Sequence, residues 1–295
     1  MSESGSGGSW GPDCSNSPNH PIGGVTKCKQ TEFQWGSRTY IMGIVNVTPD
    51  SFSGDGLGSD VEAAVAQGKR FVAEGADILD IGGESSRPGA EPVNSAVELE
   101  RVIPVLERLA DEVEVPLSID TYKSEVAVEA LAAGANMIND VWGLKHDQDI
   151  AKVAADAGAP LILMHNQVGT EYSDLIGQVV GSLTKSIKDA MDAGVAWENL
   201  IVDPGIGFGK TKDHNLEVMR RLRDFKCLGR PILLGTSRKS MIGLTMNLPV
   251  DDRLEGTAAT VSLGIASGAD VVRVHDVKVM GRVARMSDSI VRPQY

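Results

Sequence analysis

The chain has 295 residues, which suits one large α/β domain or two small ones, and its 42% hydrophobic but only 4% aromatic content means that the core must be aliphatic. The formal net charge of −12 at pH 7 argues against a general nucleic-acid surface or an anionic membrane as partner, although a few local cations could still hold a phosphate. The 3 cysteines form no C-x-x-C pair, which suggests reduced thiols and a cytoplasmic location. The sequence shows neither an apolar run that could span a bilayer nor a secretory signal.

Residues 1–32 are expected to be a flexible N-terminal tail. Up to residue 30 the sequence is rich in Gly, Ser, Asn and Pro and almost without aliphatic residues, so it can bury little apolar surface. A tag remnant or a binding segment is the alternative. Organised sequence starts near Phe33, and we expect residues 33–295 to form one domain.

Apolar segments with the length of strands alternate with longer segments of helical spacing along the rest of the chain. The expected strands begin near Tyr40, Asp77, Pro116, Met137, Pro160, Leu200, Pro231 and Val271. The expected helices are Val61–Glu74, Ser95–Ala110, Lys123–Ala133, Asp149–Ala157, Asp174–Ala193, Asn215–Phe225, Leu254–Ala266 and Val277–Ile290. Such a repeat over about 250 residues predicts a (β/α)8 TIM barrel. An open doubly wound sheet is the alternative, but it would normally carry a G-x-G-x-x-G turn after the first strand, and the sequence has none there.

Polar residues stand at the carboxyl ends of the expected strands, where TIM barrels keep their active sites. Asp120 and Asn139 end the third and fourth strands, and Asp203 ends the sixth. Carboxylates and an amide around one pocket can match the donors and acceptors along the edge of a heterocycle. A single Asp in such a place is more often a helix cap, but several on separate strands favour a function. His165 ends the fifth strand and either lines the pocket or is structural.

Cationic residues end the seventh and eighth strands, where barrels often bind phosphate. The segment Gly235–Ser240 carries Arg238 and Lys239 after the seventh strand. Because side chains alternate along a strand, Arg273 and His275 share one face at the end of the eighth. Two donors on one face suit a phosphate or pyrophosphate.

The first two loops also predict ligand contacts. Asn46 ends the first strand, and the glycine-rich stretch after it could cover a ligand, with a simple polar turn as the alternative. The second loop holds Ser86 and Arg87 beside a glycine, which suits anion capture, although a surface arginine there can simply be solvated.

Seven segments in order resemble the dihydropteroate synthase family of pterin-binding enzymes. They are MGIVNVTPDSFSGDG from Met42, DIGGESSRPGA from Asp80, SIDTYK from Ser118, MINDVWG from Met137, DPGIGFGKT from Asp203, GTSRKS from Gly235 and RVHDV from Arg273. The resemblance covers the chain from about Thr39 to the C-terminal helix. One such segment would be a weak signal, but the whole series in order on separate strands is specific.

The resemblance implies a transferase of folate biosynthesis and the target of sulfonamides. It implies that para-aminobenzoate is joined to the pyrophosphate ester of hydroxymethyl-dihydropterin, with Mg2+ as cofactor and pyrophosphate as leaving group. Departure of pyrophosphate would leave a cation that buried carboxylates stabilise, so the neutral arylamine needs no strong general base. The resemblance also implies a homodimer, for which the helices Leu254–Ala266 and Val277–Ile290 are the candidate faces.

The resemblance further implies a role for individual residues. The implied catalytic residues are Asp120, Asp203, Lys239, Arg273 and His275. The implied pterin contacts are Asp120, Asn139, Met164, Asp203, Phe208 and Lys239. The implied pyrophosphate contacts are Asn46, Ser86, Arg273 and His275, with Asn46 also at the Mg2+. The implied para-aminobenzoate contacts are Phe52, Ser86, Arg87, Pro88 and Ser237.

Two departures from the family pattern concern the loops. Ser86 stands where the family commonly has Thr, and residues 53–56 read Ser-Gly-Asp-Gly instead of Ser-Asp-Gly-Gly. The loss of a methyl group could loosen contacts with aminobenzoate or a sulfonamide. Two other functions are alternatives: a pterin-binding methyl-transferase domain that serves a corrinoid, and a non-catalytic homologue. The first would leave residues 237–239 and the pair Arg273 and His275 unexplained, since its substrate lacks pyrophosphate. The second predicts gaps among the charged strand ends, which the sequence does not show.

Overall fold

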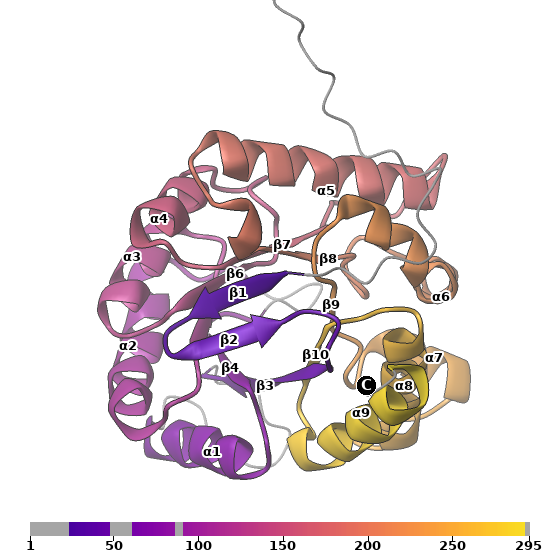
Figure 1. Ribbon diagram of the computed structural model, residues 1–295, viewed down its shortest axis with the longest axis horizontal. Coiled ribbons are helices and arrows are strands. Elements are labelled where there is room, and N and C mark those ends of the chain that lie inside the picture. Colours follow the sequence, from indigo (N-terminus) through magenta and orange to yellow (C-terminus); the bar gives the residue numbers. More distant parts are fainter. Residues whose placement is uncertain (1–23, 48–60, 86–90, 293–295) are drawn as a thin grey trace, which may run out of the picture.

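A ring of parallel strands surrounded by helices forms the centre of the molecule (Figure 1). The computed structural model describes residues 24–47, 61–85 and 91–292. The ring strands are β3 (Tyr40–Asn46), β4 (Ile78–Gly82), β5 (Leu117–Asp120), β6 (Met137–Asp140), β7 (Leu161–Met164), β8 (Leu200–Asp203), β9 (Leu233–Leu234) and β10 (Val271–Val274). Their order is β8-β7-β6-β5-β4-β3-β10-β9, and a parallel bridge between Val202 and Ile232 brings the two edge strands together. The predicted TIM barrel is confirmed.

The helices follow the strands on the outside of the ring (Figure 1). They are α1 (Val61–Ala73), α2 (Ser95–Glu112), α3 (Ser124–Ala132), α4 (Asp149–Ala157), α5 (Leu175–Asp192), α6 (Lys212–Arg220), α7 (Ser240–Met246), α8 (Leu254–Ala266) and α9 (Val277–Val291). Several of their ends coincide with capping residues, because unpaired backbone groups at a helix end need partners. Asn94 caps α2 by accepting from Val97 N at 2.9 Å, and Gly158 ends α4 with a φ of +63°.

Two helices differ from the prediction. The helix expected at Asn215–Phe225 starts at Lys212, because Thr211 caps it by accepting from His214 N at 3.2 Å. It gives way to a 3-10 helix over Leu222–Leu228. The short helix α7 was not predicted.

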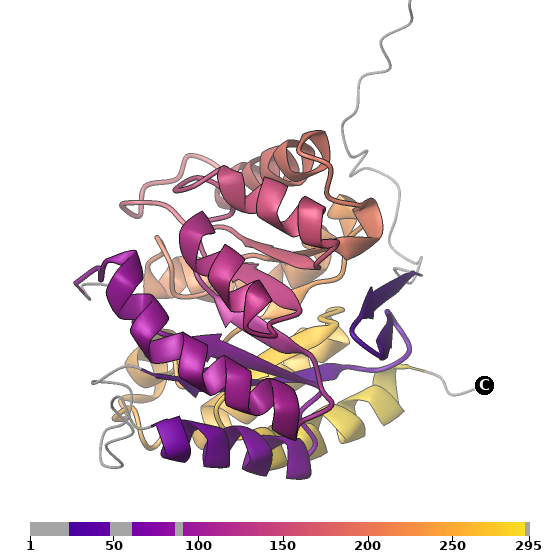
Figure 2. The same ribbon diagram turned by 90° about the vertical axis from the view of Figure 1, so that its left-hand side faces the viewer.

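A hairpin closes the end of the barrel where the strands begin (Figure 2). It consists of β1 (Val25–Cys28) and β2 (Thr31–Gln34), which pair antiparallel. Phe33 is 0% exposed and belongs to an inner core with the residues that point into the barrel from its strands. Its ring stacks on Trp35 at 5.4 Å and meets Tyr40 edge-on at 4.9 Å. The expectation that residues 1–32 form a flexible tail is therefore wrong for residues 25–32, which belong to the hairpin. Burial of the aromatic residues that follow orders this segment, although its own composition does not predict order.

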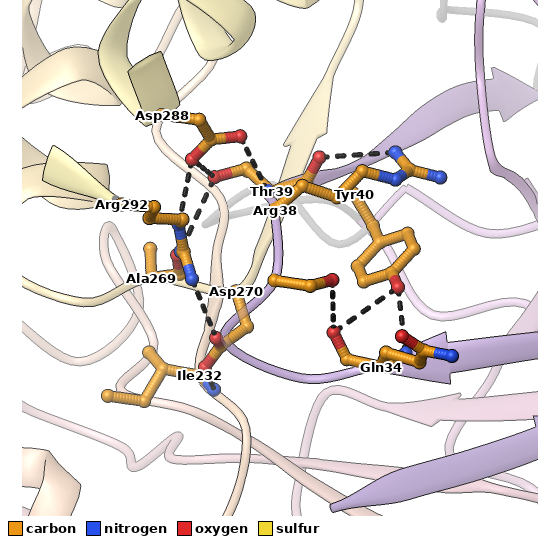
Figure 3. A network of polar contacts seen from close by, with 10 residues as sticks. Gln34, Arg38, Thr39, Tyr40, Ile232, Ala269, Asp270, Asp288 and Arg292 are labelled. Atoms are coloured by element: carbon orange, nitrogen blue, oxygen red, sulfur yellow. Dashed lines mark hydrogen bonds and ion pairs between the residues drawn. The ribbon is translucent and has the colours of Figure 1, made fainter. Parts of the chain in front are cut away.

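The C-terminal helix is tied to the same end of the barrel by a polar network (Figure 3). Asp288 accepts from the backbone N of Thr39 at 2.7 Å and from its hydroxyl at 2.8 Å. Arg292 donates to Asp288 at 2.8 Å and to the carbonyl of Ala269 at 2.7 Å. The network links α9 to the segments that start β3 and β10. It therefore lies at the end of the barrel opposite to the polar strand ends. Within the described ranges no helix is both long and apolar enough to cross a membrane.

Candidate active site

Arg273 and Asp80 form the centre of the polar cluster at the carboxyl ends of the strands. Arg273, on β10, donates from Nε to Asp80 Oδ2 and from Nη2 to Asp120 Oδ2, both at 2.6 Å. Asn139 on β6 donates from Nδ2 to the same oxygen of Asp80 at 3.1 Å. One carboxylate oxygen of Asp80, which is 0% exposed, therefore orients both a guanidinium and an amide.

The register of the sheet explains why these side chains meet. Asp120 on β5 pairs with Asn139 on β6, and both are buried. Since side chains alternate along each strand, residues at equal height on neighbouring strands point to the same side. Met164 pairs in the same way with Asp203 at the ends of β7 and β8.

Lys239 and Asp203 lie beside this cluster around Gly235. A Cβ built on Gly235 would lie 3.7 Å from Lys239 Nζ, 3.9 Å from Asp203 Oδ2 and 3.9 Å from Arg273 Cβ. Glycine thus leaves open the space into which these groups point. Lys239 Nζ donates to the carbonyl of Ile206 and lies 4.5 Å from the centre of the Phe208 ring, a cation–π contact.

Asn46 approaches the same cluster from β3. A Cβ on Gly82 would lie 3.6 Å from Asn46 Oδ1 and 3.7 Å from Asp120 Oδ2, so the two oxygens border one glycine. No group of three or more His, Cys, Asp or Glu that could hold a metal occurs in the described part of the chain.

His275 and Ser237 form a second pair at the rim. Ser237 Oγ lies 2.9 Å from His275 Nδ1, and the backbone N of His275 donates to the same hydroxyl at 3.2 Å. The neighbouring Arg238, with a φ of +57°, is turned to Asp276, to which it donates from Nη2 at 2.7 Å. Of the two adjacent cations after β9, Arg238 is thus paired with Asp276, whereas Lys239 Nζ borders Gly235 together with Asp203.

Burial shifts the pKa values of several groups in the cluster. Burial raises the pKa of Asp120 to about 7, opposed by the positive charge of Arg273 and reinforced by Asp80. Burial also raises the pKa of Asp203, and it lowers the pKa of Lys239 to about 8 while Asp203 opposes that shift. The pKa of Arg273 is raised, because its carboxylate neighbours outweigh the effect of burial. Arg273 therefore stays charged, whereas Asp120, Asp203 and Lys239 lose their charge more readily than usual.

The predicted site residues thus fall into two groups. The structure brings together Asn46, Asp120, Asn139, Met164, Asp203, Phe208, Lys239 and Arg273 at the carboxyl end of the barrel, with His275 and Ser237 beside them. Phe52, Ser86, Arg87 and Pro88 lie outside the described residues.

Sequence reasoning missed Asp80 as a site residue. It stands in the middle of the strand sequence ILDIG, two residues before Gly82, so it points to the same side as Gly82. A charged residue inside a fully buried strand was the available signal, because a buried carboxylate needs a partner.

Comparisons with known proteins agree with this geometry. Residues 42–275 match the family described as pterin binding enzyme. The chain is 54% identical over 267 residues to a dihydropteroate synthase of Clostridium beijerinckii, which covers 90% of this chain and 99% of that protein. It is similar to the crystal structure of a dihydropteroate synthase from Clostridium difficile obtained with pteroic acid, with a TM-score of 0.84 and 52% identity over 88% of this chain and 98% of that one. A Xanthomonas albilineans dihydropteroate synthase in complex with 7,8-dihydropteroate has a TM-score of 0.83 and 40% identity, covering 92% of this chain and 100% of its own.

Proposed function

We propose that this chain, which belongs to the family of pterin-binding enzymes, catalyses the dihydropteroate synthase reaction. It condenses 6-hydroxymethyl-7,8-dihydropterin pyrophosphate with para-aminobenzoate and releases 7,8-dihydropteroate and pyrophosphate. The observation that carries the proposal is the meeting of Asp120, Asn139, Asp203 and Lys239 with Arg273 at the carboxyl end of the barrel.

The buried carboxylates and the amide recognise the pterin. Asp120 and Asp203 accept hydrogen bonds from ring nitrogens, and Asn139 both donates and accepts along the same edge. Met164 and Phe208 supply apolar contact to the ring faces. Lys239 donates to a ring acceptor from its place beside Asp203, and the glycine at 235 leaves room for a flat ring.

The rim groups hold the leaving group. Arg273 and His275 donate to pyrophosphate oxygens and neutralise the charge that develops as the C–O bond breaks. The amide oxygen of Asn46 is a ligand of the type that Mg2+ prefers, and Mg2+ commonly binds few protein oxygens together with substrate phosphates. When bound, the ion would add charge neutralisation at the pyrophosphate.

The charge of the cluster matches the electron-poor carbon left by pyrophosphate. Asp120 and Asp203 are buried carboxylates of the cluster, and each can stabilise positive charge on a bound pterin when it is ionised. Such a site favours a cation delocalised into the pterin. The neutral arylamine then forms the C–N bond with its lone pair and loses a proton to solvent. The family resemblance implies that Ser237, Phe52, Ser86, Arg87 and Pro88 contact aminobenzoate, and of these the structure describes Ser237.

The helices α8 and α9 supply the surface for a homodimer. They expose Leu263, Met286 and Ile290 at 64%, 63% and 71%, which is unusual for large apolar side chains on adjacent helices. Size-exclusion chromatography with light scattering tests this proposal. The wild type should elute with the mass of a dimer, and Ile290→Lys should shift the equilibrium toward the monomer. A monomeric wild type at micromolar concentration would contradict the assembly without touching the reaction. A cytoplasmic location stays a prediction from the cysteine pattern.

The reaction is tested by pyrophosphate release in the presence of Mg2+, with and without para-aminobenzoate. Release should require aminobenzoate, yield dihydropteroate and fall about 100-fold or more in Arg273→Ala. Arg38→Ala is the matched control, because Arg38 pairs with Asp77 at 2.6 Å at the opposite end of the barrel and should leave turnover unchanged. A wild type that binds pterin but releases no pyrophosphate would refute the proposal and favour methyl transfer or a non-catalytic role.

A further inference from the structure

The loop that follows β8 carries two groups that contact Lys239. Its residues 204–210 provide the carbonyl of Ile206, which accepts from Lys239 Nζ, and the ring of Phe208, which lies 4.5 Å from the same atom. The position of the Lys239 ammonium therefore depends on the conformation of this loop.

Glycines let the loop pack tightly against its surroundings. Gly205 has a φ of +72°, and a Cβ there would overlap the carbonyl oxygen of His165. Gly207 has a φ of +85°, and a Cβ there would lie 3.0 Å from Lys239 Cδ. A loop this rich in glycine has many alternative conformations, so a specific contact must select the observed one.

Lys210 supplies that contact. Its side chain is 9% exposed, and its Nζ donates to the carbonyls of Gly205 at 3.0 Å and Phe208 at 3.1 Å. Nζ also lies 2.9 Å from Nδ1 of His165, at the end of β7. An ammonium has three protons and no acceptor, so His165 must accept at Nδ1 and carry its own proton on Nε2. All three donors of Lys210 are thus used, two within the loop and one on the neighbouring strand end.

We propose that Lys210 is a positioning residue that fixes the loop 204–209 against His165 and thereby places Lys239 beside Asp203 for pterin binding. The inference rests on the proposed function, in which Lys239 is a pterin contact. Lys210 itself is turned to backbone carbonyls and His165, so it acts through Lys239.

The charges around Lys210 agree with this role. Burial lowers the pKa of His165 to about 3, and Lys210 and Lys145 add to the shift, so the imidazole stays a neutral acceptor. Burial lowers the pKa of Lys210 to about 7; Asp203 opposes the shift, and Lys239 and Lys145 reinforce it. At a pH below this value the ammonium form of Lys210 predominates, and it can then donate all three of its protons to Gly205, Phe208 and His165.

The test compares Lys210→Met with Lys145→Met. Lys145 is the matched control, because it is also a partly buried lysine that donates to a backbone carbonyl, that of Asn166 at 2.6 Å, but it does not contact the loop. The Kd for 6-hydroxymethyl-dihydropterin, which lacks pyrophosphate, should rise about tenfold or more in Lys210→Met and stay unchanged in Lys145→Met. The KM for para-aminobenzoate should not follow.

A double-mutant cycle separates positioning from general destabilisation. If Lys210 acts through Lys239, Lys210→Met should cost little further pterin affinity in a Lys239→Met background. Equal losses in both backgrounds, or an unchanged Kd in a folded Lys210→Met protein, would overturn the inference. Should Lys210→Met not fold, Lys210→Arg carries the same test, because a planar guanidinium cannot converge on the three acceptors, and an unchanged Kd would again overturn it.

Hydrogen exchange separates a failure of the inference from a failure of the proposed function. Amides 205–209 should exchange faster in Lys210→Met than in Lys145→Met, whether or not the wild type has synthase activity. Equal exchange in the two variants would overturn the inference while leaving the reaction untouched. A wild type without synthase activity would refute the reaction but not the role of Lys210 in the loop.

Discussion

Asp80→Asn should weaken the contacts of Asp80 with Arg273 and with Asn139 without changing the shape of the site. The substitution keeps the size of the side chain but removes the charge that Arg273 Nε contacts at 2.6 Å and that Asn139 contacts at 3.1 Å. A hydrogen bond to a charged group contributes about 1.5–3 kcal/mol and a neutral one about 0.5–1.5 kcal/mol. Because Asp120 still holds Arg273 through Nη2, we expect a combined loss of about 2–3 kcal/mol rather than the upper limit.

In kinetic terms that loss is a fall of about 30- to 150-fold in kcat/KM for the pterin substrate, if both contacts act in the transition state. The assay is pyrophosphate release at saturating para-aminobenzoate, with urea unfolding measured in parallel. The free energy of unfolding should fall less than the about 3–5 kcal/mol that follows when a buried pair is broken, since Arg273 keeps one carboxylate.

Asp77→Asn is the matched control for the same chemical change. Asp77 accepts from Arg38 Nη2 at 2.6 Å, but half of the Arg38 side chain is exposed and the pair lies where the strands begin. Such a pair contributes about 0.2–1 kcal/mol, and its loss should leave kcat/KM unchanged. The reasoning fails if Asp80→Asn keeps kcat/KM within about twofold of wild type, or if Asp77→Asn loses as much.

Three further expectations concern pH, the hairpin and the loop after β8. Because burial raises the pKa of Asp120 to about 7, its carboxylate becomes protonated as pH falls through that value, and kcat/KM should decline on the acid side of neutrality. Asp80→Asn should move this decline to lower pH, because the charge of Asp80 contributes to the raised pKa of Asp120. A flat profile of kcat/KM from about pH 5 to 8 would contradict the reasoning. Phe33→Ala should lower the free energy of unfolding in urea by about 3–5 kcal/mol while kcat/KM stays unchanged, and a loss below about 1 kcal/mol would count against the inner core. Gly205→Ala should weaken pterin binding about tenfold or more in a titration, whereas Gly181→Ala, where a Cβ meets open space, should bind normally; equal affinities would argue against a rigid loop.

Much of the fold could be predicted because its signals are local. Short apolar runs ended by a polar residue and followed by helical spacing recur along the chain, and the strands lie within a residue or two of their predicted starts. The hairpin could not be predicted in this way, since Phe33 and Trp35 gain their order from packing on Tyr40 and the strands beyond it. The short helix α7 was hidden for a related reason: it is too brief for helical periodicity to be distinguished from a loop.

The candidate site, too, could be predicted from the sequence only in part. That polar strand ends of a parallel barrel share one end follows from topology, so the sequence alone determined the candidate set of Asp120, Asn139, Asp203 and Arg273. Which groups pair was decided only by the tertiary structure: Arg273 lies 193 residues from Asp80 and 153 from Asp120 along the chain. Pairing depends on distances of a few ångströms between side chains on different strands, and local sequence pattern does not specify such distances. The sequence therefore determined which polar residues are candidates for the site, and the folded barrel determined which of them form hydrogen bonds with one another.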